Sequence, residues 1–346
     1  MAEPILIWGA GAIGGTIGAS WQRAGLDVLL VDKVAAHVEA CRTAGLSIEG
    51  PVERFTQVIA AATPDEIEGV YRRIVLAVKA QHTEAALDAL APHLAADGCV
   101  LSAQNGLNEL AIARRVGPER TMGCFVNFGA DWLGPGRILY GNRGAVVVGE
   151  VDGSIRDRTR EMHGLLEIFE PDALLTDDIW GYLWGKLAYG AMLFATALTA
   201  DSMTANFADP ARAPAWLAIG REVAAVANAR GVTPRGFGDF RPEAFAPGVP
   251  EAEALDAIAW LAEYTAQSAK THSGIWRDLA VRKRRTEIDA QIGVIGALAR
   301  EKGIPTPALD RLVGLIHDVE DGRRPQSLDT FNELLKACSS DLTPAP

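Results

Sequence analysis

The sequence predicts an α/β protein whose first part is a parallel sheet covered by helices and whose second part is all helical. Three observations lead to this prediction. Short apolar runs alternate with helical segments through the first half, a glycine-rich turn follows the first run, and long helical segments broken by glycine and proline fill the second half. Because 346 residues exceed what one hydrophobic core usually serves, we expect two domains, 1–178 and 179–346, with Asp177 and Asp178 at the hinge.

Composition argues against several classes of protein. Apolar residues make up 49% of the chain and charged residues 22%, which is ordinary for a soluble globular protein. The net charge of −11 argues against nucleic acid or an anionic membrane as the main partner. The four cysteines are scattered without metal-ligand spacing, so we expect no metal site, reduced thiols and a cytoplasmic location. The basic run RKRR at 282–285 is expected to be a solvated helix face or an anion-binding cluster.

The first elements are a strand, a tight turn and a helix. Ile5–Ile7 is an apolar run, the glycines after it follow the pattern G-x-G-x-x-G, and Thr16–Ala24 has helical character. The first glycine permits the turn, the second lets the backbone approach a pyrophosphate, and the third lets the helix pack on the strand. Free N–H groups at the helix start would face the anion. The residues expected to contact a dinucleotide in this Rossmann-type turn are Gly9, Gly11, Ala12, Ile13 and Gly14.

The second strand ends in a carboxylate. Val28–Val31 is apolar and Asp32 follows it directly. A carboxylate at this point accepts hydrogen bonds from the adenosine ribose hydroxyls and repels a 2′-phosphate, so NAD(H) is favoured as cofactor. NADP(H) remains possible because Lys33 could tolerate a phosphate, and Asp32 could instead only cap a turn.

Two polar residues follow later strands of the same alternation. Lys79 comes directly after the run Arg73–Val78, and Asn105 lies in the QNG turn after Cys99–Ser102. Ligands of doubly wound sheets bind outside the carboxyl ends of the strands, so the pair favours a cofactor crevice, although each alone could be an ordinary turn residue. Further expected elements are a strand at 57–61, a helix at 83–94, and strands at 121–126, 137–140 and 145–149 that extend the sheet in antiparallel fashion.

The second half opens with a helix that is apolar on nearly every face. The segment 179–200 carries one formal charge, Lys186. A charge in a buried helix is costly unless it is paired or faces a wet cavity, and a desolvated lysine suits a proton donor. The alternative is a lysine that snorkels to the surface.

The remaining second half is predicted to be helical. We expect helices at 213–230, 252–270, 282–302 and 307–320, and an unusual loop at Thr271–Asp278 before the third of them. That third helix contains the sequence RTEID at 285–289 near its start. Its Thr-Glu pair could be no more than capping chemistry.

Five short motifs stand in one order along the chain: GAGAIGG at 9–15, VKA at 78–80, QNG at 104–106, WGKLA at 184–188 and RTEID at 285–289. In this order and spacing the chain resembles the ketopantoate reductase family of 2-hydroxyacid oxidoreductases over nearly its whole length. The resemblance implies a Rossmann NAD(P)-binding domain, a helical substrate domain and an active site in the cleft between them. It also implies hydride transfer between a nicotinamide and C2 of a small 2-oxo or 2-hydroxy acid, by a monomer or a homodimer.

The resemblance further implies roles for single residues. Lys186 matches the general acid that protonates the developing alkoxide, and Glu287 matches the carboxylate that positions substrate and lysine. Lys79 and Asn105 match residues that face the cofactor and the reacting carbon, and Ser273 matches a serine at the polar end of the substrate.

Several positions depart from the pantothenate-pathway enzymes of the family. Those enzymes carry asparagines one and two helical turns after the lysine, where this chain has Gly190 and Phe194. Loss of these amides removes specific hydrogen bonds to the substrate. Trp276 in the loop at 271–278 indicates a reshaped, more apolar pocket, and Asp32 departs from the NADPH-dependent members.

Three hypotheses about function follow. The first is a ketopantoate reductase-like oxidoreductase whose 2-oxo or 2-hydroxy acid is not ketopantoate. The second is authentic 2-dehydropantoate 2-reductase, with the missing polar contact supplied from elsewhere, for which Thr196 is a candidate. The third is a non-enzymatic dinucleotide sensor, which would have no need of Lys186 and Glu287.

Overall fold

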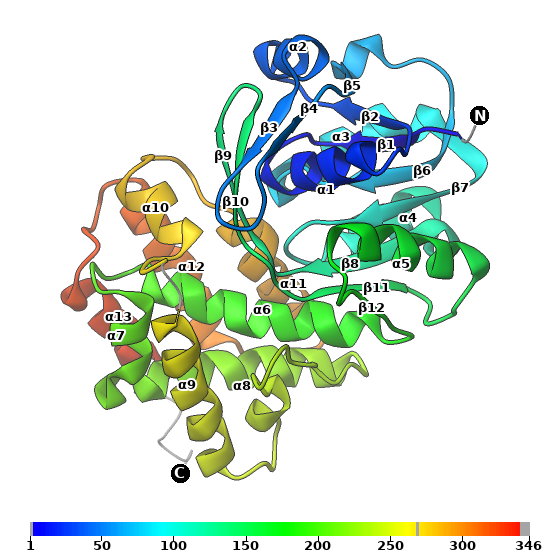
Figure 1. The fold of residues 1–346 in the computed structure, drawn as a ribbon. Helices are drawn as coiled ribbons and strands as arrows, with labels where there is room; N and C mark the ends of the chain where they lie inside the picture. The colour runs from blue at the N-terminus through cyan, green and yellow to red at the C-terminus, as the bar shows by residue number, and fades with distance from the viewer. Residues whose placement is uncertain (1–2, 268–269, 340–346) are drawn as a thin grey trace. The chain divides into compact units, whose positions relative to one another are not determined.

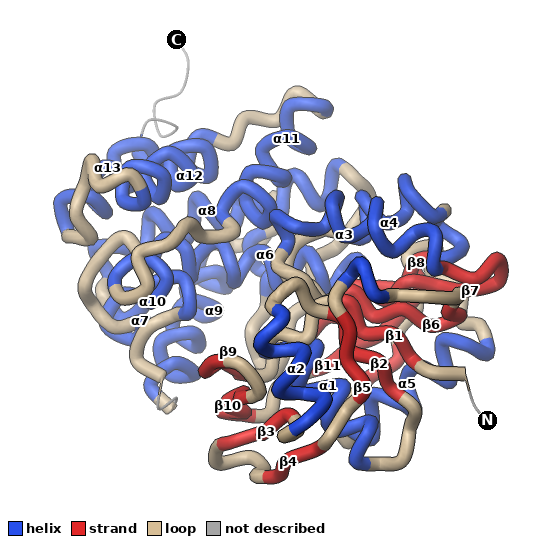
Figure 2. The backbone as a smooth tube through the Cα atoms, turned by 90° about the horizontal axis from the view of Figure 1, so that it is seen from above, coloured by secondary structure: helices blue, strands red, loops and turns tan. Residues whose placement is uncertain are grey.

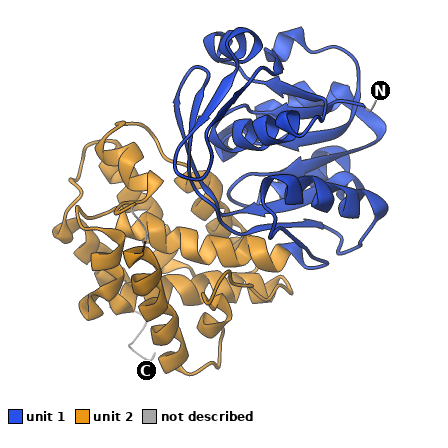
Figure 3. Cartoon of the chain, in the orientation of Figure 1, with its two compact units in different colours: residues 1–179 blue, residues 180–346 orange. Residues whose placement is uncertain are grey.

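The protein consists of two compact units, Met1–Ile179 and Trp180–Pro346 (Figure 3). The computed structural model describes residues 3–267 and 270–339. The first unit is built on a mainly parallel sheet and the second unit is helical, which confirms the α/β class with a helical second part (Figure 1).

An eight-stranded sheet forms the centre of the first unit. Its strands are β1 (Ile5–Trp8), β2 (Val28–Val31), β5 (Ala60–Ala62), β6 (Tyr71–Leu76), β7 (Leu94–Ser102), β8 (Thr121–Val126), β11 (Val146–Glu150) and β12 (Leu174–Leu175), in the spatial order β12-β11-β8-β7-β6-β1-β2-β5. The strands from β5 to β8 in this order pair in parallel, and β11 is antiparallel to β8. Strand β1 therefore lies between β2 and β6, so its carboxyl end is close to the ends of both neighbours.

Successive residues of the central strands point to opposite faces of the sheet, and each face is buried. Ile5 and Ile7 belong to the core on the side of α1 (Ala12–Arg23) and α5 (Asp157–Phe169). Leu6 and Trp8 belong to the core on the opposite side, where Leu87 of α3 (Thr83–Leu90) and Ile112 of α4 (Glu109–Val116) pack (Figure 2). Burial on both faces explains why these strands read as continuous apolar runs.

A second, four-stranded sheet corrects part of the sequence prediction. It contains β3 (Leu46–Glu49), β4 (Phe55–Gln57), β9 (Gly129–Gly134) and β10 (Arg137–Asn142), in the order β4-β3-β10-β9. The expected strand at 137–140 therefore belongs to this sheet, and the expected strand at 57–61 divides into β4 and β5. The segment at 121–126 pairs in parallel with β7, so of the three strands predicted to extend the sheet in antiparallel fashion, only the one found at 146–150 does so. Pairing partners of short strands are set by tertiary packing and not by their own sequences.

The second unit is helical, and the helix α6 leads into it. Its α-helices are α6 (Ile179–Thr196), α7 (Met203–Ala208), α8 (Ala213–Ala229), α9 (Glu251–Ala266), α10 (Gly274–Ala280), α11 (Val294–Glu301), α12 (Pro307–Glu320) and α13 (Leu328–Ser339). The expected loop at 271–278 is wrong in part, because Ser273 caps α10 through a bond from the Trp276 N–H (3.1 Å).

The predicted helix at 282–302 begins later than expected. Residues 282–286 are not helical, helical structure starts at Ile288, and a π-helical turn at Asp289–Gly293 precedes α11. Lys283 has φ of 48°, a left-handed conformation that interrupts a helix. The RTEID segment is therefore the entry to a helix and not its interior.

Candidate active site

The glycine-rich turn after β1 combines two packing glycines with one open glycine. Gly9 has φ of 106°, and a Cβ there would lie 2.6 Å from the Val78 nitrogen. A Cβ on Gly14 would lie 2.1 Å from the Gly9 oxygen, so neither position tolerates a side chain. A Cβ on Gly11 would meet no atom of the described residues within 4 Å, apart from its own chain neighbours. The turn therefore leaves open space next to the N-terminus of α1.

The N-terminus of α1 is suited to an anion. Gly11 is its N-cap, and its first turn holds no acidic residue and no side-chain cap among the described residues. The first N–H groups of a helix have no partner within the helix, and the helix dipole favours negative charge there. The N–H groups of Ala12, Ile13 and Gly14 are therefore placed to hold a pyrophosphate.

Asp32 is fixed by two backbone bonds. Its Oδ2 accepts from the Ala10 N–H (3.1 Å) and its Oδ1 accepts from the Val34 N–H (2.9 Å). Asp32 thus does cap its own turn, through the bond from Val34. The bond from Ala10 also holds the carboxylate next to the glycine-rich turn. Each carboxylate oxygen has a second lone pair, so Asp32 keeps acceptor capacity for ribose hydroxyls.

His37 holds the glycine-rich turn from the other side. Its side chain is buried, its Nδ1 accepts from the Gly136 N–H (2.9 Å), and its Nε2 lies 2.8 Å from the Ala10 oxygen. Because Nδ1 is an acceptor, Nε2 carries the hydrogen and donates to Ala10. This neutral histidine in α2 (Ala35–Thr43) joins the turn to the second sheet.

A buried polar chain connects the loops that follow β6 and β7. The Gln104 amide donates to the Val78 oxygen and to the Thr83 hydroxyl, each at 2.8 Å. Thr83 in turn donates to the Asn108 side chain (2.8 Å), whose Nδ2 donates to the Asn105 oxygen (2.8 Å). The chain locks the two loops to each other.

The two predicted strand-end residues lie on these locked loops. Lys79 follows β6 and is half-buried, while Asn105 follows β7 and is exposed. Because β1, β6 and β7 are successive neighbours in the sheet, both residues share its carboxyl edge with the glycine-rich turn.

The helix α6 has one partly open stripe. From 181 to 198 every residue is buried except Tyr182, Lys186, Gly190 and Leu193. These positions recur every three or four residues, so they lie along one face of the helix. Lys186 is therefore not enclosed in the core of the unit, and the residue one helical turn further along the same face is a glycine.

The second proposed catalytic residue stands at a helix entry. Glu287 is half-buried, and its carbonyl oxygen accepts from the Gln291 N–H (3.0 Å). The preceding residue, Thr286, does the local capping, since its hydroxyl oxygen lies 3.3 Å from the Ile288 nitrogen. Capping is therefore carried by the threonine of the Thr-Glu pair.

Glu320 holds this entry in place. Its side chain is 1% exposed and accepts from the Thr286 N–H (2.7 Å), the Thr286 hydroxyl (2.8 Å) and Arg285 (2.9 Å). His317 Nδ1 lies 2.9 Å from the same carboxylate, and its Nε2 lies 2.9 Å from Asp289. Burial raises the pKa of Glu320, but the bonds from Thr286 and His317 outweigh it and hold the pKa below its ordinary value.

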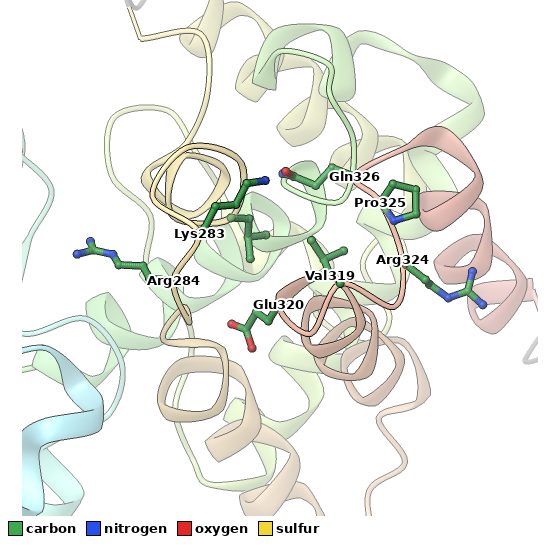
Figure 4. Close-up of a pocket in the computed structure, with 9 residues that line it drawn as sticks. Lys283, Arg284, Val319, Glu320, Arg324, Pro325 and Gln326 are labelled. Carbon is green, nitrogen blue, oxygen red and sulfur yellow. The ribbon is translucent and has the colours of Figure 1, made fainter.

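The run at 282–285 is largely neutralised within its own unit. Arg282 and Arg284 both bind Asp278, at 2.8 and 2.9 Å, and Arg285 binds Glu320. A pocket beside this run is also lined by Val319, Pro325 and Gln326, and Figure 4 shows the side chains of Arg284 and Arg324 extending away from it. The arginines therefore do not converge on an anion, and their bonds are local ion pairs.

The other predicted substrate residues lie in the same helical unit. Ser273 is buried and accepts the capping bond of α10. The Trp276 indole donates to the Thr199 oxygen (3.0 Å), and its ring lies next to that of His272, with centroids 4.1 Å apart and planes tilted by 36°. Phe194 is fully buried at 0% exposure, so it belongs to the core of the unit and not to the open stripe.

Four residues that support the site were not predicted from the sequence. They are His37, Gln104, which connects two loops, Glu320 and Gln291. Gln104 had a visible signal, because it opens the QNG motif. His37, Glu320 and Gln291 act through partners far away in the chain, so no local pattern marks them. Among the described residues, no helix is long and apolar enough to cross a membrane, and no group of three or more His, Cys, Asp or Glu side chains is arranged for a metal.

Comparison with known sequences identifies the class and then the family. Residues 5–153 match the model described as "Ketopantoate reductase PanE/ApbA", and residues 178–320 match "Ketopantoate reductase PanE/ApbA C terminal". With the Rossmann sheet and its glycine-rich turn, these matches make the chain an NAD(P)-dependent oxidoreductase acting on CH–OH groups. The chain belongs to the ketopantoate reductase family.

Curated relatives and solved structures cover nearly the whole chain. A 2-dehydropantoate 2-reductase of Mesorhizobium japonicum is 29% identical over 338 residues, covering 90% of this chain and 96% of the relative. One of Archaeoglobus fulgidus is 28% identical, with 92% and 99% covered. A PanE/ApbA family ketopantoate reductase of Ralstonia eutropha (25% identity) and D-mandelate dehydrogenase with NADH and anilino(oxo)acetate (23%) have TM-scores of 0.76 and 0.80, each covering 92% of this chain and 99% of the neighbour. The last of these likenesses concerns the fold alone.

Proposed function

We propose that the protein transfers a hydride between NAD(H) and C2 of a 2-oxo or 2-hydroxy acid other than ketopantoate. The observation that carries this proposal is the partly open stripe of α6, on which Lys186 is followed one turn later by Gly190. Outside its own helix and among the described residues, a Cβ on Gly190 would meet one atom within 4 Å, the Gln291 Oε1 at 3.9 Å, so the position has room for the start of a side chain. A substrate side chain of different shape from that of ketopantoate fits such a space.

The residues of the first unit fit a nicotinamide dinucleotide. The open space at Gly11 and the N–H groups of Ala12, Ile13 and Gly14 suit the pyrophosphate, and the fixed carboxylate of Asp32 suits ribose hydroxyls. That carboxylate would repel a 2′-phosphate, which favours NAD(H), although the exposed Lys33 next to it leaves NADP(H) open. When bound, the nicotinamide supplies or accepts the hydride at C4.

The helical unit supplies the proton chemistry. In the reductive direction the carbonyl oxygen at C2 becomes an alkoxide, and the Lys186 ammonium donates a proton to it; in the oxidative direction the neutral amine takes the proton back. Glu287, with its carboxylate, positions the lysine and the substrate. Lys79 and Asn105 face the cofactor and the reacting carbon, and Ser273 binds the polar end of the acid. Trp276 makes the surroundings of the substrate more apolar, whereas the fully buried Phe194 leaves the place of the second asparagine without a polar group that faces the substrate.

The test is a set of initial rates with NADH and NADPH, in both directions, on ketopantoate and on bulkier or unhydroxylated 2-oxo acids. We expect NADH and an acid other than ketopantoate to give the highest kcat/KM. Lys186→Met should abolish hydride transfer, whereas Lys302→Met, at an exposed position of the same unit, should not. Ketopantoate with NADPH turned over at least as efficiently as every other pair would refute the proposal.

Authentic 2-dehydropantoate 2-reductase is the second candidate, favoured by the names of the curated relatives. Thr196 does not support it well, because its hydroxyl donates to the Leu193 oxygen (2.8 Å) and the residue is 2% exposed. Rescue of a pantothenate auxotroph by the gene would support this candidate. A non-enzymatic dinucleotide sensor is the third hypothesis, and hydride exchange abolished by Lys186→Met would eliminate it.

A further inference from the structure

An amide from another helix borders the space that Gly190 leaves. Gln291 lies in the π-helical turn at Asp289–Gly293, and its Oε1 lies 3.9 Å from the position that a Cβ on Gly190 would take. Outside the backbone of α6 itself, no other atom of residues 3–267 and 270–339 lies within 4 Å of that position. Gln291 is therefore the neighbour of the open space one turn beyond Lys186.

The Gln291 side chain is mostly buried. The residue is 9% exposed, and within residues 3–267 and 270–339 its side-chain amide makes no hydrogen bond. Its amide atoms are not among the fully enclosed unpaired polar atoms of the described chain, so they still reach open space. An amide that has no protein partner and borders an open space is placed to bond a ligand in that space.

The backbone sets this placement relative to the proposed catalytic residue Glu287. The Gln291 N–H donates to the backbone carbonyl oxygen of Glu287, so Gln291 stands one helical turn after Glu287. Gly190 likewise stands one turn after Lys186 on α6. Each residue of the Gly190–Gln291 pair thus stands one turn, about 5.4 Å, beyond a residue of the proposed catalytic pair, so we place C2 of the substrate at the catalytic pair and C3 and C4 at Gly190 and Gln291.

We propose that Gln291 is a substrate-specificity residue that hydrogen-bonds an uncharged polar group, a hydroxyl above all, on the C3–C4 side of the 2-oxo acid. A neutral amide offers both a donor and an acceptor, which matches a hydroxyl and gives no net attraction to a second carboxylate. A rotation of the terminal amide exchanges the places of its oxygen and its nitrogen. The amide can therefore present its acceptor to a substrate group that donates, or its donor to a group that accepts. This inference rests on the proposed function, because it assigns the far end of the same substrate.

The experiment compares 2-oxo acids that differ only in a hydroxyl. One pair is 4-hydroxy-2-oxopentanoate and 2-oxopentanoate, and another is ketopantoate and 3,3-dimethyl-2-oxobutanoate. We expect the wild-type protein with NADH to prefer the hydroxylated member of at least one pair by about tenfold or more in kcat/KM, equivalent to about 1.4 kcal/mol. Gln291→Leu, which keeps the approximate volume, should remove that preference, mainly by raising KM, because the bond is present before and during the reaction.

Two further variants separate a substrate contact from a structural one. Gln326→Leu also removes an amide from this unit, one that donates to the Ala197 oxygen (2.8 Å), and it should leave the preference for the hydroxyl unchanged. The double variant Gly190→Asn with Gln291→Leu supplies an amide from α6 in place of the one from the π-helical turn. It should restore part of the preference, since a Cβ at position 190 has room.

The outcomes distinguish the two proposals. If the wild-type protein turns over neither these acids nor any of the bulkier 2-oxo acids named above with either cofactor, the proposed function fails. If it turns them over but prefers no hydroxylated member, or if Gln291→Leu lowers both members of a pair equally, the role of Gln291 is wrong while the oxidoreductase activity stands. A thermal unfolding curve for each variant identifies any loss that comes from misfolding.

Discussion

The substitution Gly11→Ala is expected to weaken cofactor binding while leaving the stability of the fold nearly unchanged. The backbone at Gly11 has φ of −69°, which alanine adopts without strain, and its Cβ would meet nothing within 4 Å. The only structural cost is that alanine is a poorer N-cap than glycine, which is about 0.5–1 kcal/mol. The added methyl instead occupies the space that a pyrophosphate needs for contact with the N-terminus of α1.

The expected loss of affinity follows from the bonds at stake. A hydrogen bond to a charged group is worth about 1.5–3 kcal/mol, so displacement of one phosphate oxygen from one N–H group weakens NADH binding about 10- to 150-fold. Titration of NADH fluorescence measures this loss, and thermal unfolding of the free protein measures stability. Gly14→Ala is the opposite case, because its Cβ would lie 2.1 Å from the Gly9 oxygen and overpacking costs about 1–3 kcal/mol of unfolding free energy.

The control is a glycine far from the turn. Gly314 lies inside α12 and a Cβ there would meet nothing within 4 Å, so Gly314→Ala should leave NADH binding unchanged and stabilise the fold by up to about 1 kcal/mol. If Gly11→Ala binds NADH as tightly as the wild-type protein, the glycine-rich turn does not hold the pyrophosphate and the reasoning is refuted.

Three further substitutions test the carboxylate of Asp32, the hydrogen bonds between the loops after β6 and β7, and the ion pairs of His317. Asp32→Ser should narrow the preference for NADH over NADPH, measured as the ratio of kcat/KM, and an unchanged ratio would mean that Asp32 only caps its turn. Gln104→Leu should weaken NADH binding several-fold and lower the melting temperature by a few degrees, because it breaks two buried hydrogen bonds. Unaltered binding would show that cofactor affinity does not depend on the hydrogen bonds between the loops after β6 and β7. Burial lowers the pKa of His317, but its bonds to Glu320 and Asp289 outweigh this and raise the pKa above 6.5. The stabilisation that protonated His317 contributes is therefore full below about pH 6.5 and is lost as pH rises through the folded-state pKa. The difference in melting temperature between the wild-type protein and His317→Gln should accordingly shrink above pH 6.5. A difference that widens with pH would contradict this.

The sequence predicted the parts of the fold that are governed by local chemistry. The turn at Gly9 to Gly14 needs its glycines for reasons of backbone space, and the apolar runs of β1, β6 and β7 are buried on both faces. Pairing of β10 with β3 was not predictable, because either sheet offers an edge to a short apolar strand. The late start of the helix after Lys283 was missed for a similar reason, since local propensity does not reveal that Asp278 and Glu320 hold the basic run in an extended path.

The proposed catalytic pair and the proposed specificity pair differ in how visible they are. Lys186 stands out because it is the one formal charge in an apolar helix, and Glu287 because it lies in a recognisable motif. Gly190 can be noticed in the sequence only because it lacks the side chain that other members of the family carry there. Gln291 can be assigned a role only from the structure, in which the π-helical turn brings its amide to the space beside Gly190. Reaction chemistry requires particular functional groups, whereas substrate choice depends on which group fills a given volume. A change of substrate therefore needs no change in the motifs that identify the family, and the side chains that decide it are found by asking which atoms face the space that a missing side chain leaves.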